Sequence, residues 1–506
     1  MRGTEPNPTA EAAPLASRAA RGGLWVALSS YFNIAFGFLA NLALTRILAP
    51  EHFGIFALAQ FFFSLLNLRP KLGLNQALGQ RRETTGELIG THLTLDVIGG
   101  LATLLLAALA APLLRALGYS RDVTWVVLAL AAVGVSDSLM GTAWVLLDRD
   151  LRFGRTGLVC SLAFPVSYLP GFWLALRGAG YWSLVAQNAT YAVLLLVGMW
   201  WSTRQHLPHI LRLKWRFDGQ VARELLRFGA LVGLVTLAGL LLTQFDNFLV
   251  GTFVGVTVLG YYDRAYRIAQ WPSLLLTTLS NRTAFYTYAR LQDDSARLHK
   301  ALTMTLWLTI TLALPLALAI FVAAPDLVSV LYGERWLPTV VFLRFLVAYS
   351  LLRPLLDIAT SLFVAIGRPQ QSSLIVGAEA ATLIVVATPL TLSRGAVGTC
   401  IGVGLAFAVG LLLAYRQVRR RVALSIRDTF APPAVSAALT VLVYGLLVRN
   451  LDLAHLPTWE RAFVKGGLVA AMSLLLLLAL ERRRFVERCR YTWRLMRGSQ
   501  SATPAS

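Results

Sequence analysis

Long apolar runs separated by short polar segments make up most of this sequence. Each run contains ~20 predominantly apolar residues, which is the length that an α-helix needs to cross the hydrocarbon core of a bilayer. The runs begin near Leu24, Phe53, Leu88, Val123, Thr156, Tyr181, Phe228, Val256, Leu302, Val340, Ser373, Val397, Pro433 and Ala462. The pattern therefore predicts an all-α integral membrane protein with about 14 transmembrane helices.

An internal repeat lies within this hydrophobic pattern. When the sequence is shifted by about 200 residues, two stretches align without a gap, and both are apolar segments broken by a short turn that contains Gly or Pro. The aligned pairs are Asn41 and Asn247, Arg46 and Thr252, Gly54 and Gly260, and Ala59 and Ala265, with Gly23 and Gly229 at the same offset. Tandem membrane repeats are typical of transporters that bind their substrate between two similar halves.

The repeat predicts two six-helix lobes in tandem, followed by two helices that have no counterpart in it. The polar stretch between the lobes is basic with interleaved aromatic residues, so we expect an amphipathic connector on the inner leaflet. The expected parts are a cytoplasmic tail (1–20), an N-terminal lobe (21–203), an amphipathic cytoplasmic linker (204–227), a C-terminal lobe (228–417), two additional helices (418–480) and a basic cytoplasmic tail (481–506).

Composition and charge support a membrane location and set the orientation. Of the 506 residues, 57% are hydrophobic and 14% are charged, and 46 basic against 25 acidic residues give a net charge of +21. Most of the basic residues fall in loops that face the cytoplasm when the N-terminus is placed inside, as the positive-inside rule requires. We therefore expect both termini in the cytoplasm and attribute the basic excess to membrane topology rather than to nucleic-acid binding.

The sequence carries no strong pattern for catalysis or for a metal site. Its three cysteines are far apart, its six histidines form no ligand motif, and it lacks a Walker-type phosphate loop. The segment Asp148-Arg-Asp150 has the DxD spacing of many glycosyltransferases, but no nucleotide-binding domain surrounds it. We therefore predict a transport protein without a metal or cofactor rather than an enzyme.

Charged residues within the predicted spans are the candidate functional residues. Such a group costs ~2.5–3.5 kcal/mol to insert, so it usually faces a cavity or a partner. Arg264 and Arg267 are three residues apart on one predicted helix and therefore share a face, whereas Asp263 is expected to point elsewhere. Arg353 and Asp357 are four residues apart and are expected to pair within their own helix.

These residues suggest a cationic cavity for an anionic substrate, because a guanidinium group gives phosphate two hydrogen bonds and stays charged. The substrate-binding candidates are Arg264, Arg267, Arg344, Arg353 and Arg46, and the ion-coupling candidates are Asp246, in the helix before Arg264, and Asp263. The alternative is that these side chains form structural ion pairs or reach the interface from the ends of spans. For Asp96, Asp137 and Glu379 a role in helix packing is the preferred interpretation.

Several short motifs resemble those of a known transporter family. The segment from Arg46 to Gly54, Arg-Ile-Leu-Ala-Pro-Glu-His-Phe-Gly, resembles the Arg-x-Leu-x-Pro-x-x-Phe-Gly motif of the polysaccharide-transport family. This family comprises the Wzx-type flippases of the multidrug/oligosaccharidyl-lipid/polysaccharide exporter superfamily. Similar motifs occur in the expected order at 246–251, 260–265, 290–294, 333–336 and 367–369. One departure is Phe285-Tyr-Thr-Tyr, where many members have a Pro.

The resemblance implies a bacterial inner-membrane flippase. Such proteins move an undecaprenyl-diphosphate-linked oligosaccharide to the outer face by alternating access, driven by a proton or sodium gradient, and polysaccharide polymerases and glycosyltransferases are the expected partners. One alternative is a flippase for the lipid-linked peptidoglycan precursor, which shares the fold. A multidrug exporter of the same superfamily fits less well with the intramembrane arginines. A polysaccharide polymerase or ligase would need a large outer loop, which this sequence lacks.

Overall fold

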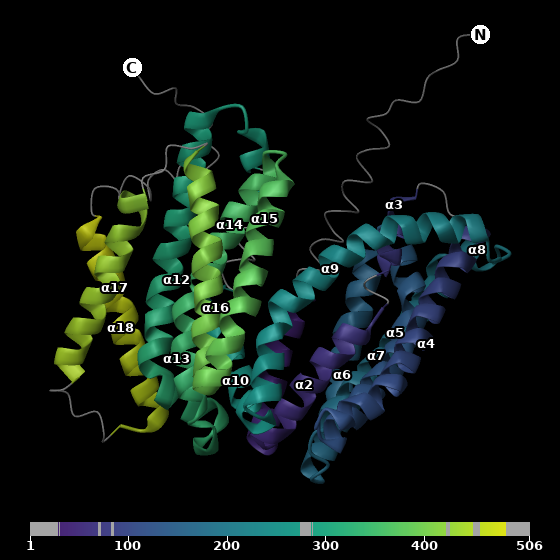
Figure 1. Cartoon of the computed structure of the whole chain (residues 1–506), viewed down its shortest axis with the longest axis horizontal. Helices are drawn as coiled ribbons and strands as arrows, with labels where there is room; N and C mark the ends of the chain where they lie inside the picture. The colour runs from purple at the N-terminus through teal and green to yellow at the C-terminus, as the bar shows by residue number, and fades with distance from the viewer. Residues whose placement is uncertain are drawn as a thin grey trace. The chain divides into compact units, whose positions relative to one another are not determined.

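The computed structural model describes residues 29, 31–68, 72–81, 85–273, 285, 287–420, 426–448 and 456–481, and within these ranges helices are the only regular secondary structure (Figure 1). The chain divides into two compact units, the first from Met1 to Gly260 and the second from Tyr261 to Ser506. Each unit has its own packed interior.

The first unit is a bundle of long helices. Residues 31–47 are helical, and the next helices along the chain are α2 (Pro50–Leu66), α3 (Leu74–Gln80), α4 (Gly86–Ala116), α5 (Arg121–Arg149), α6 (Phe153–Leu176), α7 (Trp182–His206), α8 (Pro208–Leu211) and α9 (Gly219–Phe253). Side chains cap several helix starts: Thr85 accepts a hydrogen bond from the Leu88 amide, and Asp218 accepts one from the Gln220 amide. Helix α6 packs along α7, and α4 packs along α5.

The second unit contains most of α10 (Val256–Ala269), whose first turn belongs to the first unit. Its other elements are α12 (Ser295–Tyr332), the 3₁₀ turn η2 (Glu334–Trp336), α13 (Thr339–Ser350), α14 (Leu352–Ala365), α15 (Pro369–Thr382), the π-helical turn η3 (Leu383–Ala387), α16 (Thr388–Arg419), α17 (Ile426–Val448) and α18 (Thr458–Leu480). Helix α18 packs against α12 along its length. This contact is reinforced by Asp326, whose carboxylate accepts hydrogen bonds from Arg461 and Lys465, each at 2.6 Å.

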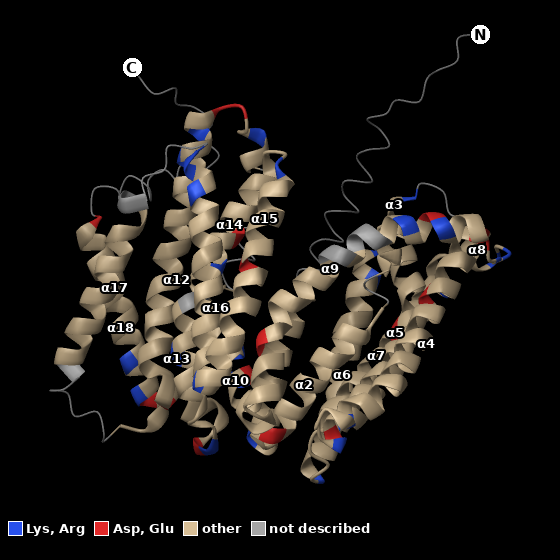
Figure 2. Ribbon diagram, in the orientation of Figure 1, with Lys and Arg blue, Asp and Glu red and all other residues tan. Residues whose placement is uncertain are grey.

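Nine segments of the described residues are long and apolar enough to cross a membrane. The protein is therefore a multi-pass, all-α membrane protein, and within each unit the charged residues lie mostly near the ends of the helices (Figure 2). Part of the predicted first and eighth spans lies outside the described residues, so the count of about 14 helices stays a prediction.

One of these segments, Pro369–Arg419, is 51 residues long and folds back on itself. The break is at Gly395, whose φ of 61° is accessible to glycine at little cost. On either side of it the Thr391 and Thr399 hydroxyls are hydrogen-bonded at 2.8 Å. The segment thus forms two antiparallel stretches, in agreement with the separate span starts predicted near Ser373 and Val397.

The boundary between the compact units differs from the lobe boundary expected from the repeat. Helix α9 begins within the predicted linker and packs against α2, α3 and α4, so it belongs to the first unit by its contacts. The repeat assigns α9 to the C-terminal lobe instead. The lobe boundaries at 203 and 228 derive from the sequence repeat and not from contacts between helices. The two-lobe division therefore stays a prediction.

Candidate functional site

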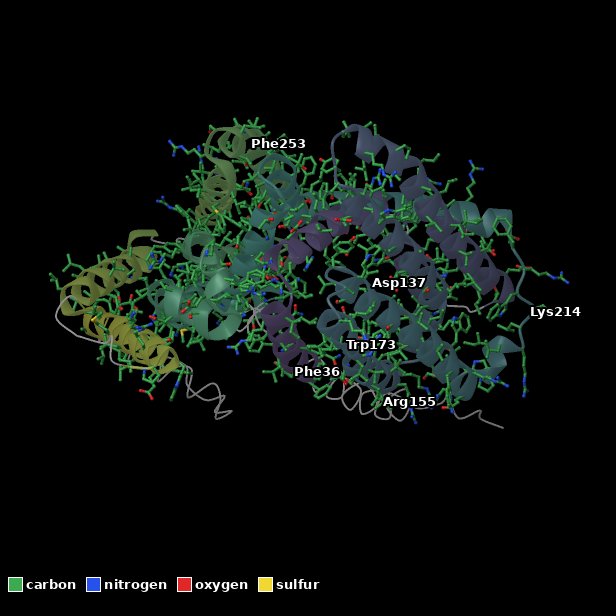
Figure 3. All side chains as sticks on the ribbon, turned by 90° about the horizontal axis from the view of Figure 1, so that it is seen from below. Phe36, Asp137, Arg155, Trp173, Lys214 and Phe253 are labelled. Carbon is green, nitrogen blue, oxygen red and sulfur yellow. The ribbon has the colours of Figure 1, made fainter. Side chains whose placement is uncertain are left out.

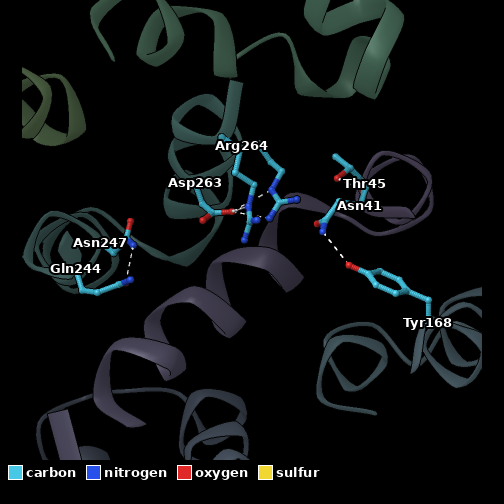
Figure 4. Close-up of polar contacts among 8 residues, drawn as sticks. Asn41, Thr45, Tyr168, Gln244, Asn247, Asp263 and Arg264 are labelled. Carbon is cyan, nitrogen blue, oxygen red and sulfur yellow. Dashed lines mark hydrogen bonds and ion pairs between the residues drawn. The ribbon is translucent and has the colours of Figure 1, made fainter. Parts of the chain in front are cut away.

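Three charged side chains of α10 meet at one carboxylate oxygen. Arg264 is only 2% exposed, and its Nη2 and Nε donate hydrogen bonds to Oδ2 of Asp263 at 2.6 and 3.0 Å (Figure 4). Arg267 Nε donates to the same oxygen at 3.2 Å. We refer to Asp263, Arg264 and Arg267 as the α10 cluster.

The α10 cluster confirms one sequence expectation and overturns another. Arg264 and Arg267 do come together, as their spacing predicts. The expectation that Asp263 points away from Arg264 is wrong. The side chains of neighbouring residues leave a helix in directions about 100° apart. The long side chain of Arg264 nevertheless bends back, so that its guanidinium reaches the carboxylate of Asp263.

Aromatic side chains lie beside the α10 cluster. The rings of Tyr261 and Trp336 are 5.8 Å apart, and the rings of Tyr332 and Trp336 are also 5.8 Å apart. Tyr332 is buried and interacts electrostatically with Arg264. Sequence reasoning singled out neither Tyr332 nor Trp336, although Trp336 ends one of the family-like motifs and Tyr261 lies in another.

The α10 cluster has a net charge of +1, because two guanidinium groups face one carboxylate. Arg264 is buried, whereas the side chain of Arg267 is 53% exposed and so is accessible to a ligand. Around the buried Arg264, charge is screened less than in water. The arrangement is therefore suited to bind an anion such as a phosphate group.

The other two candidate arginines of the second unit, Arg344 and Arg353, make contacts of their own. Arg353 Nε donates to Asp357 Oδ1 at 3.1 Å, which confirms the predicted pair, and its guanidinium lies 5.8 Å from the Phe407 ring. Arg344 is exposed and lies over the Phe321 ring at 5.7 Å. Asp357 thus balances the charge of Arg353, and Arg344 sits on an aromatic face.

The remaining candidates belong to the first unit. Arg46 is exposed near the end of the helix formed by residues 31–47. Asp246 is buried in α9, and its Oδ1 accepts a hydrogen bond from the Asn247 amide at 2.9 Å.

The repeat-related asparagines have different partners: Asn41 donates to the Tyr168 hydroxyl at 3.1 Å and Asn247 to Gln244 Oε1 at 3.1 Å (Figure 4). Among the described residues no group of three or more His, Cys, Asp or Glu could hold a metal ion.

The repeat-related glycines lie at a close helix crossing. A Cβ on Gly54 of α2 would be 1.6 Å from the carbonyl oxygen of Val256, and a Cβ on Gly260 of α10 would be 1.9 Å from that of Pro50. Both pairs, 54 with 260 and 50 with 256, are separated by 206 residues in the sequence. Each copy of the repeat therefore contacts the other through the corresponding residues, as a twofold relation between them would require.

Comparison with known proteins assigns the chain to a family. Residues 43–341 match the family described as "Polysaccharide biosynthesis protein". The chain belongs to this family. Among its relatives, the lipopolysaccharide biosynthesis protein WzxC of Escherichia coli K12 is 23% identical over 69% of this chain and 70% of its own length. The succinoglycan biosynthesis transport protein ExoT of Rhizobium meliloti is 24% identical over 62% of each chain.

Solved transporter structures share the fold of this polysaccharide biosynthesis family member. The inward-closed lipid II flippase MurJ has a TM-score of 0.73 at 13% identity and covers 91% of this chain and 100% of its own. An inward-facing multidrug transporter of the MATE family has a TM-score of 0.61 at 16% identity, covering 76% and 94%. The predicted resemblance to the Wzx-type polysaccharide-transport family is thus confirmed, and the protein is a membrane transporter of polysaccharide biosynthesis, not an enzyme. The two solved structures show that it shares their fold.

Proposed function

We propose that this protein is a flippase that moves undecaprenyl-diphosphate-linked oligosaccharides across the bacterial inner membrane. They would be repeat units of an exopolysaccharide, capsule or lipopolysaccharide. Family membership supports this proposal, as do relatives named for the biosynthesis of lipopolysaccharide, succinoglycan and teichuronic acid. Polysaccharide polymerases and glycosyltransferases are the expected partners, and both termini are expected in the cytoplasm.

The observation that carries this proposal is the α10 cluster. The cluster places two guanidinium groups beside one carboxylate in a segment that is predicted to span the membrane, where arginine is costly. The phosphates of a diphosphate headgroup would accept hydrogen bonds from these guanidinium groups, of which that of Arg267 is half-exposed. Asp263 would hold both arginines in place until the headgroup arrives.

The other candidates would have smaller roles. Arg344 and Arg353 would guide the headgroup, and Arg46 would act at the mouth of the pathway. Asp246 and Asp263 would respond to the coupling proton or sodium ion, Asp246 because it is a buried carboxylate in α9 and Asp263 because its charge is coupled to the two arginines. On this proposal Asp246→Asn abolishes the dependence of transport on the ion gradient in proteoliposomes while the headgroup still binds.

Alternating access would take place around the crossing of α2 and α10. The two glycine contacts leave no space between these helices, so the crossing is a suitable fixed point while other helices separate. Because the crossing joins corresponding residues of the two repeats, the helices around it could open toward either side of the membrane by equivalent motions.

Complementation of a deletion strain that lacks a redundant flippase tests the function. We expect wild type to restore extracellular polysaccharide, and Arg264→Ala/Arg267→Ala to leave lipid-linked oligosaccharide on the inner leaflet. Arg297→Ala, which removes an exposed arginine paired with Asp294, is the control, and all variants are compared at equal membrane abundance. Normal polymer in the deletion strain would refute the function, whereas full rescue by the double variant would refute only the role of the α10 cluster.

A further inference from the structure

The connector between α7 and α9, residues 207–218, is held firmly to the first unit. Leu207 and Ile210 are buried in a core cluster that also contains residues of α4, α5, α6 and α7. The Trp215 indole donates a hydrogen bond to the Ile210 carbonyl at 3.2 Å, and its ring lies 5.8 Å from that of Trp200. The side of the connector that faces the first unit is therefore held in place by these contacts.

The backbone of the connector runs directly over the start of α4. A Cβ on Gly86 would be 2.3 Å from the Lys214 carbonyl oxygen, and a Cβ on Gly90 would be 2.7 Å from the Arg216 backbone. The Asp218 amide donates to the Thr91 hydroxyl at 2.9 Å. These contacts hold the connector against the N-terminal turns of α4, a helix long and apolar enough to span a membrane.

The outer side of the connector combines cations with large apolar groups. Arg212, Lys214 and Arg216 are exposed, and Figure 3 shows Lys214 at the edge of the first unit, pointing away from the ribbon. Leu213, between the first two of these cations, is 38% exposed, and Phe217, which follows the third, is 56% exposed. The one carboxylate of this stretch, Asp218, accepts hydrogen bonds from two amides at the start of α9.

We propose that residues 212–217 form a binding site for the headgroups of anionic phospholipids in the leaflet at this end of the first unit. Three cations on a rigid backbone complement a layer of lipid phosphates, and each is expected to add to the attraction. Leu213 and Phe217 enter the boundary between headgroups and acyl chains, which an acidic protein partner would not require. This site is separate from the α10 cluster and does not depend on the proposed substrate.

The first test measures lipid selectivity with the purified full-length protein in bilayers of phosphatidylcholine and phosphatidylglycerol. Electron paramagnetic resonance of spin-labelled lipids gives the preference of the protein for the anionic lipid. We expect Arg212→Gln/Lys214→Gln/Arg216→Gln to lower this preference toward unity. The control Arg290→Gln/Arg297→Gln/Lys300→Gln removes three exposed cations of the second unit. It should retain most of the preference for the anionic lipid. Equal losses in both variants, or no loss in the first, would overturn the proposal.

The second test locates Phe217 directly. The variant Phe217→Cys carries a fluorescent label in a background where Cys160, Cys400 and Cys489 are replaced by Ser. We expect brominated phosphatidylglycerol to quench the label strongly and aqueous iodide to quench it weakly. Strong quenching by iodide with none by the brominated lipid would mean that this surface faces water, as a docking site for a protein would, and would overturn the lipid site.

Discussion

Helices α2 and α10 start from corresponding positions of the repeat, yet their next two turns carry different residues. Both begin with a close contact through a glycine, Gly54 or Gly260. After that point α2 continues with Ala57, Leu58 and Phe61, whereas the equivalent positions of α10 are Asp263, Arg264 and Arg267. The shared part sets the backbone crossing, and only the second copy adds charge. The comparison indicates that the repeat supplies the scaffold and that the divergence from it supplies the charges that we propose bind the substrate.

The largest effect is expected when α10 receives the residues of α2. The variant Asp263→Ala/Arg264→Leu/Arg267→Phe removes three charges from the predicted eighth span, so it should insert at least as well as wild type. Each lost charged hydrogen bond is worth about 1.5–3 kcal/mol, so we expect transport to fall by roughly 10- to 100-fold or more. The measurement is export of polymer at matched protein abundance, and wild-type export would contradict the comparison.

A smaller effect is expected from filling the glycine contacts. Gly54→Ala and Gly260→Ala should each destabilise the protein by about 1–3 kcal/mol, because a methyl group has no space at either position. The two effects should be similar, since the contacts are reciprocal. Thermal unfolding in detergent checks this, with Gly239→Ala as the control because no atom lies within 4 Å of its Cβ. A loss at only one of the two glycines would argue against the twofold relation.

Replacing arginine with lysine should separate charge from geometry. Arg264→Lys retains the charge but loses the two-point contact of the guanidinium with Asp263 Oδ2. We expect a loss of about 1 kcal/mol in headgroup affinity, smaller than for Arg264→Leu. The affinity of each variant for an isoprenyl diphosphate measures the difference. An equal loss of affinity in Arg264→Lys and Arg264→Leu would mean that the geometry of the guanidinium, rather than its charge, determines headgroup binding.

The smallest effect is expected at Arg353. Its guanidinium is half-exposed and paired with Asp357, so removing it should cost about 0.3–1 kcal/mol of stability. Arg353→Ala should therefore retain most of the transport that the α10 variants lose. Complementation by Arg353→Ala beside Arg264→Ala checks this order, and a reversed order would place the substrate nearer Arg353.

The sequence predicted the helical membrane fold, the family and the meeting of Arg264 with Arg267, because these depend on apolar run length, short motifs and helical spacing. It missed the orientation of Asp263, since a flexible arginine can bring together side chains that start on different faces. It also missed Tyr332 and Trp336, which approach α10 through a tertiary contact. Periodicity specifies neighbours within one helix, whereas contacts between helices depend on packing that a single sequence does not determine.

We propose that the charges of α10, and not the shared repeat scaffold, bind the substrate headgroup. The most direct test is to measure binding of a short-chain isoprenyl diphosphate disaccharide to the purified protein in nanodiscs. Wild type is compared with Asp263→Ala/Arg264→Leu/Arg267→Phe, and both must show the same unfolding temperature. We expect saturable binding to wild type that is lost in the variant. Equal binding by both proteins would contradict the proposal and would place the headgroup site elsewhere in the chain.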